Sequence, residues 1–168
     1  KLYLVSRFFI KTFKMINIIF SQEYKNHDTG NHPESIERIK VVNNLIKEEY
    51  SKHNHIEPTI ADKKIISLVH DLEYVNKIYD SIPNSGFTYF DPDTIASPNS
   101  LKSYLLAVGG SVDAVKYILD NKNKGVFFCA HRPPGHHAES NKAMGFGVFN
   151  NVAVSAQYAL NSGKFKKI

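Results

Sequence analysis

The chain has 168 residues, of which 42% are hydrophobic and 22% are charged. This length supports one hydrophobic core and argues against two domains, and the balance of apolar and charged residues excludes a disordered chain. The formal net charge of +5 comes from basic residues that are scattered along the sequence. Direct binding of nucleic acid is therefore not expected.

The first 14 residues combine basic and aromatic side chains without any acidic one. We interpret residues 1–14 as a leader or extraneous segment. Its basic residues interrupt the apolar run too often for a membrane span, so no membrane contact is expected. The single cysteine, Cys129, cannot form an intramolecular disulfide. This favours a reducing compartment: the cytoplasm, or the nucleus if the organism is eukaryotic.

Apolar periodicity predicts alternating strands and helices in the first part of the chain. The β-branched run at 16–20 predicts a buried strand, and the apolar face of 34–50 predicts a helix. Residues 61–81 fit two short helices joined near residues 70–71. The stretch at 83–100 contains three of the seven prolines, which predicts a long surface loop.

The second part of the chain continues the same alternation. An apolar stripe predicts a helix at 101–120, and the continuous apolar run at 126–130 predicts a strand with both faces covered. A loop at 131–147 and a helix at 149–161 follow, and residues 164–168 resemble the start of another strand. The alternation predicts an α/β fold in which the two apolar strands are parallel members of one sheet.

The loop at 131–147 carries the most informative motif, which includes two adjacent histidines, His136 and His137. The loop leaves the carboxyl end of a predicted buried strand, where open α/β sheets place ligands, and two prolines stiffen its backbone. Neutral imidazoles exchange protons near neutral pH, so the pair is suited to acid and base roles in amide hydrolysis. Metal ligation and a purely structural pair remain alternatives on these residues alone.

The string RPPGHHA at 132–138, with GF at 145–146 and FNN at 149–151, is similar to the signature of the histone deacetylase and acetylpolyamine amidohydrolase superfamily. The similarity is greatest to its class II and bacterial members. Other segments resemble further motifs of the superfamily: HDTG at 27–30, HPE at 32–34 with Arg38, VHD at 69–71 with YV at 74–75, and DPDT at 91–94 with SP at 97–98. The resemblance implies a partial three-layer, parallel-sheet fold of the arginase/deacetylase kind.

The resemblance also implies roles for individual side chains. His136 and His137 correspond to the tandem histidines at the catalytic zinc, with His137 as the general base and His136 as its electrostatic partner. Phe146 corresponds to an aromatic wall of the tunnel that holds the acetylated amine, and Gly145 to a tunnel or backbone-contact position. Asp93 corresponds to a rim carboxylate that contacts the substrate backbone.

The remaining implied role belongs to Arg38, which corresponds to a cation lining an inner channel for released acetate. Taken singly, the residues have simpler explanations: Phe146 suits a core, Arg38 a surface ion pair and Asp93 a turn. Only the shared pattern favours the functional roles. Gly147 stands where many members of the superfamily have cysteine, and this change is expected to enlarge the space near the site.

The zinc ligands of the family have no counterpart in this sequence. The family supplies an Asp-x-His pair and a second Asp, whereas this chain has no Asp-x-His and no Asp after Asp120. The resemblance therefore implies that residues 15–168 are the N-terminal half of a deacetylase domain. Zn²⁺ is expected for the complete domain, no metal ligand is expected in this chain, and the chain alone is expected to be inactive.

Two functions are compatible with these observations. The first is a zinc-dependent amide hydrolase, truncated before its ligands, that removes acetyl groups from acetyl-lysine or small acetylated amines. The second is a non-catalytic binding or interaction remnant of the same fold. In both cases the partial sheet is expected to leave an exposed edge through which the chain associates.

Overall fold

The computed structural model describes residues 15–121 and 125–168 of the chain. The expected leader at 1–14 lies outside the described residues. Within the described ranges, no helix combines the length and the apolar character needed to cross a bilayer.

A parallel sheet of three strands lies at the centre of the described structure. Its strands are β1 (Asn17–Ile19), β2 (Asn54–Ile56) and β5 (Phe127–Cys129), in the order β2-β1-β5. The central strand β1 pairs in parallel with both neighbours. The predicted parallel relation of the two apolar strands is therefore confirmed.

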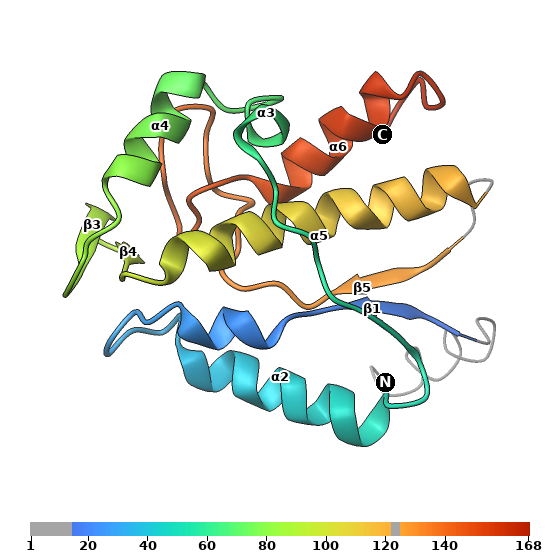
Figure 1. Ribbon diagram of the computed structural model, residues 1–168, viewed down its shortest axis with the longest axis horizontal. Coiled ribbons are helices and arrows are strands. Elements are labelled where there is room, and N and C mark those ends of the chain that lie inside the picture. The colour runs from blue at the N-terminus through green and yellow to red at the C-terminus, as the bar shows by residue number, and fades with distance from the viewer. Residues whose placement is uncertain (1–14, 122–124) are drawn as a thin grey trace, which may run out of the picture.

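Helices cover both faces of this sheet and form a three-layer arrangement (Figure 1). On one face lies α2 (Ile36–Glu49), where Ile46 packs with Ile18 of β1. On the opposite face lie α5 (Ser100–Asp120) and α6 (Asn151–Asn161), which pack on each other in the main core. The observed layers agree with the predicted α/β class.

Two short helices precede α5, as the apolar spacing predicts. They are α3 (Lys63–Ile66) and α4 (Leu72–Asp80). Asp62 caps the first, because its carboxylate accepts a hydrogen bond from the Ile65 amide at 2.8 Å. A 3-10 helix, η1 (Gln22–Asn26), lies in the loop between β1 and α2.

The stretch at 83–100 is not the long surface loop that its prolines predict. It contains an antiparallel hairpin of β3 (Thr88–Asp91) and β4 (Thr94–Ala96). Asp91 closes the turn, because its carboxylate accepts a hydrogen bond from the Asp93 amide at 2.8 Å. The flanking aromatic and β-branched residues supply the strand preference that the proline content hides.

The strand β2 is a second feature that the sequence analysis missed. It is short and polar, so no apolar pattern marks it, and its strand conformation depends on pairing with β1. His55 lies in β2, and just before the strand the His53 Nδ1 atom accepts a hydrogen bond from the Ile16 amide at 3.3 Å.

The strand β5 lies at the edge of the described sheet. Its apolar run predicts cover on both faces, yet the Phe128 side chain is 52% exposed. Residues 164–168 do not form the expected strand, because they pair with no described strand, and Lys164 instead donates a hydrogen bond to the Leu119 carbonyl. Association through the β5 edge remains a prediction.

Candidate active site

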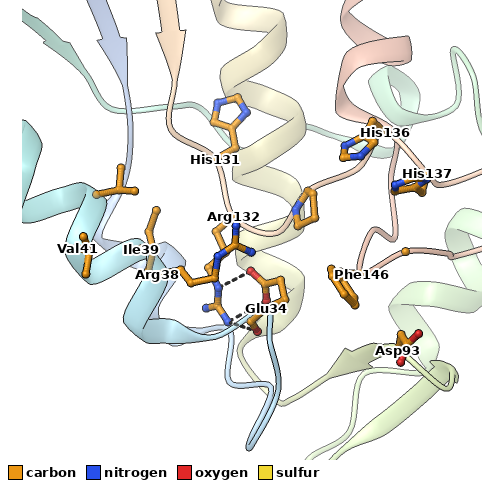
Figure 2. A pocket seen from close by; sticks show the side chains of 13 residues that line it. Glu34, Arg38, Ile39, Val41, Asp93, His131, Arg132, His136, His137 and Phe146 are labelled. Atoms are coloured by element: carbon orange, nitrogen blue, oxygen red, sulfur yellow. Dashed lines mark hydrogen bonds and ion pairs between the residues drawn. The ribbon is translucent and has the colours of Figure 1, made fainter. Parts of the chain in front are cut away.

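A cavity of about 800 Å³ lies between the start of α2, the β3–β4 hairpin and the loop that follows β5 (Figure 2). Its walls combine side chains from segments that are far apart in the sequence. The cavity brings together all six site residues that the sequence analysis selected: Arg38, Asp93, His136, His137, Gly145 and Phe146.

The two adjacent histidines lie on one wall of this cavity. The imidazole rings of His136 and His137 are 4.2 Å apart between centroids and are tilted by 47°. The two histidines are the central residues of a turn, because the Ala138 amide donates to the Gly135 carbonyl at 3.0 Å. A Cβ atom on Gly135 would lie 2.1 Å from the Phe149 carbonyl oxygen, so only glycine fits at this turn.

The Gly-Phe pair approaches the second histidine closely. Gly145 has a φ of 58°, and a Cβ atom added to it would lie 2.7 Å from Cγ of His137. Phe146 also has a positive φ, 69°, which is unusual for a bulky residue. Its amide donates to the Thr94 hydroxyl at 3.2 Å, so the hairpin helps to hold this conformation.

The aromatic ring of Phe146 contacts the loop before α2. It meets the His32 ring edge to face, with centroids 4.9 Å apart. In the view of Figure 2, Phe146 lies between the two histidines and Asp93. Asp93 is exposed in the turn of the hairpin, so its carboxylate is accessible at this side of the cavity.

Gly147 does not enlarge the site as expected. A Cβ atom at this position would lie 2.9 Å from both Cα of Gly135 and the Pro134 carbonyl oxygen. The backbone of the histidine loop therefore already occupies the space that a cysteine side chain would need. Gly147 allows two stretches of the same loop to pack closely.

Arg38 is the exposed cation of the site. It projects from α2 toward Glu34 and Arg132 (Figure 2). None of the ion pairs in the described part of the chain includes Arg38. Its guanidinium is therefore available for an anion in the cavity.

Sequence reasoning missed a buried ion pair in the wall of this cavity. Arg132 Nε donates to Glu34 Oε1 at 2.7 Å, and both side chains are 3% exposed. The signal was present, because one residue belongs to the HPE motif and the other to the RPPGHHA motif. Their pairing, however, joins positions 98 residues apart and cannot be read from spacing.

His70 is a second structural residue that the sequence analysis did not assign. Its Nε2 atom accepts from the Asn150 amide at 2.8 Å, and its Nδ1 atom lies 3.1 Å from the Ser140 carbonyl. These partners require a neutral ring that donates from Nδ1, and burial lowers the His70 pKa in agreement. The ring thereby fixes the loop that carries the two histidines to the start of α6.

Comparison with known proteins identifies the family. Residues 32–168 match the family model described as the histone deacetylase domain. The chain belongs to the histone deacetylase family. Its similarity to a crystal structure of the HDA15 HD domain extends to the fold, with a TM-score of 0.80 at 27% identity over 89% of this chain.

Sequence relatives come from bacteria, archaea and plants. The chain is 37% identical over 152 residues to an uncharacterized protein of Synechocystis, and 30% identical over 142 residues to a probable deacetylase of Methanothermobacter thermautotrophicus. It is 29% identical over 139 residues to histone deacetylase 8 of Arabidopsis thaliana. The matches cover 87%, 84% and 82% of this chain but 49%, 42% and 37% of these relatives. The chain therefore spans half or less of the length of each, and it covers 44% of the HDA15 domain chain.

Zinc is the metal that the family resemblance implies, and a catalytic zinc needs about three protein ligands. Among residues 15–121 and 125–168, no group of three His, Cys, Asp or Glu side chains is arranged to hold a metal. His136 and His137 form a pair without a third partner of this kind. The described residues therefore do not fit zinc by themselves.

Two further histidines lie at the deacetylase-family site: His27 is buried next to Glu34, and the half-buried His131 lines the cavity itself. Burial, and then the nearby Arg132 charge, lower the pKa of His27 to about 3. Burial lowers the pKa of His131 to about 4, and its Nε2 atom has no hydrogen-bond partner among the described residues. Both rings are therefore neutral in the folded protein at neutral pH.

The lowered pKa values of these two histidines predict that acid destabilises the fold. An unfolded chain binds the proton at a pKa of about 6.5, so stability is complete above this pH and falls as the pH is lowered toward the folded values. We expect each histidine to remove about 2 kcal/mol of unfolding free energy between about pH 6.5 and pH 5. Urea denaturation over this range should show a smaller decrease for His131→Gln than for the unmodified chain. An equal decrease in both would contradict the assignment.

Proposed function

We propose that the complete protein is a zinc-dependent deacetylase that hydrolyses the amide of acetyl-lysine or of a small acetylated amine. In this proposal the chain contributes the tandem histidines and part of the substrate cavity. The observation that carries the proposal is that six residues from three separate segments line one cavity. Family membership supports the reaction class, and the shared cavity supports the choice of residues.

The adjacent histidines would perform the proton transfers. His137 takes a proton from the attacking water, and the protonated ring can then give it to the departing amine. His136, with its ring centroid 4.2 Å away, tunes the charge on this ring. Both imidazoles are exposed to the cavity, as a proton-transfer group must be.

Three other residues would bind the two parts of the substrate. The Phe146 ring provides an apolar wall for the methylene stem of an acetylated amine, and Asp93 can accept a hydrogen bond from the substrate backbone. Arg38 forms no ion pair with the residues that the structure describes, and its positive charge suits acetate as the released product. Acetate and the amine would then occupy opposite parts of the cavity.

When bound, zinc would polarise the amide carbonyl and the attacking water. Because the described residues offer no group of three ligands, we propose that another polypeptide segment supplies them. The same observation favours a second candidate function, a non-catalytic binding protein that keeps the cavity without a metal. The two functions differ in whether a complementing segment restores turnover.

A chimeric enzyme tests the proposal. Residues 15–168 replace the matching segment of Arabidopsis histone deacetylase 8, with the remainder of that relative unchanged, and the parental enzyme serves as the control. We expect the chimera to deacetylate an acetyl-lysine peptide and to lose activity with a zinc chelator, whereas the 168-residue chain alone with added zinc shows no turnover. A folded but inactive chimera would favour the binding function.

A further inference from the structure

All three guanidinium nitrogens of Arg132 donate hydrogen bonds inside the protein. Its Nε and Nη2 atoms donate to the two carboxylate oxygens of Glu34 at 2.7 and 3.0 Å. Its Nη1 atom donates to the Tyr24 carbonyl at 2.9 Å and to the His27 carbonyl. The planar guanidinium fork therefore fixes both the direction and the distance of its partners.

The ion pair is shielded from solvent, and this burial limits how much the pair can stabilise the fold. The side chains of Arg132 and Glu34 are each 3% exposed. For a buried pair, the cost of desolvating both charges offsets much of their attraction, and apolar residues of similar volume often stabilise a fold equally well. Net stability is therefore a weak explanation for this pair, whereas fixed geometry is a strong one.

The position of the pair connects it with the site. Glu34 lies four residues before Arg38, and Arg132 lies four residues before His136. Both members line the same cavity, and Figure 2 shows the pair between α2 and the loop that carries the histidines. The pair is thus a direct link between two walls of the cavity.

We propose that Arg132 and Glu34 are positioning residues that set the register between these two walls. The bidentate pair holds the segment with Arg38 at a fixed distance from the loop with His136 and His137. The use of this geometry in catalysis rests on the proposed function. The register itself is a property of the folded chain and can be measured without turnover.

The variant Arg132→Lys tests this proposal in the 168-residue chain. Lysine keeps the charge but loses the fork, so the two walls should shift while the fold remains. By NMR, we expect the contact between the His32 and Phe146 rings, which are 4.9 Å apart, to be lost, and the imidazole signals of His136 and His137 to shift. Far-UV circular dichroism should remain unchanged.

The matched control is Lys102→Met, which removes the exposed Lys102–Glu23 ion pair, 2.9 Å long, between α5 and η1. It should leave all of these signals unchanged.

A folded Arg132→Lys chain with the original ring contact and histidine signals would overturn the proposal. If that variant does not fold, Glu34→Asp, which keeps both charges but shortens one side chain, is judged by the same criteria. Failure of both variants to fold would also overturn it, because the pair would then serve folding rather than positioning.

Discussion

In the chimeric deacetylase, His137→Ala is expected to lower kcat for an acetyl-lysine peptide by about 100-fold or more. A positioned general base typically contributes about 10²–10⁴ in rate, and the His137 ring lies in the cavity in contact with Gly145. The substrate contacts remain in this variant, so KM should change much less than kcat. Steady-state kinetics over a range of peptide concentrations separates the two parameters.

The control for this experiment is His55→Ala. His55 is an exposed histidine in β2 and does not line the cavity, so its replacement should leave kcat within about twofold. A chimera whose kcat is indifferent to His137→Ala would refute the proton-transfer role, even if it remained an active deacetylase. A large loss in both variants would indicate damage to the fold.

The variant Glu34→Ala is expected to lower the free energy of unfolding of the chain by about 3–5 kcal/mol. It leaves the Arg132 guanidinium buried at 3% exposure without its counter-ion. The remaining partners of Arg132 are carbonyl and hydroxyl oxygens, which do not neutralise its charge. Urea denaturation followed by circular dichroism measures the loss, and part of the sample should already be unfolded without urea.

An exposed ion pair within α2 provides the comparison. Glu37 pairs with Lys40 three residues away, and their side chains are 74% and 53% exposed. Glu37→Ala should therefore cost less than about 1 kcal/mol, because solvent screens this pair. Equal losses from Glu34→Ala and Glu37→Ala would show that burial does not give the Arg132 pair its importance.

The strands and helices that could be predicted are those with a strong local pattern. The apolar stripe of α5 spans 21 residues, so its periodicity is clear in the sequence alone. The runs that form β1 and β5 are short but continuous and apolar. In contrast, β2 is polar, so its pairing with β1 overrides the local preference. The β3–β4 hairpin has residues that favour strands, but the prolines around it hide this preference in the sequence.

The candidate site could be predicted to a similar extent. A long motif of fixed spacing marked His136, His137, Gly145 and Phe146 as residues of one loop. The structure adds that Asp93 and Arg38 reach the same cavity from other segments. The prediction that Gly147 enlarges the site was wrong. The backbone of Pro134 and Gly135 fills that space, and the sequence does not show that the loop folds back in this way.

The sequence by itself determined the family resemblance, the α/β class and the residue types available for chemistry, because these depend on local periodicity and on a contiguous motif. Only the tertiary structure decided which charges are buried and which are free. Arg132 and Arg38 are the same residue type in neighbouring positions of the cavity, yet one is 3% exposed with a carboxylate partner and the other is exposed without an ion-pair partner among the described residues. Burial depends on long-range packing, in which segments 98 residues apart enclose the same side chain.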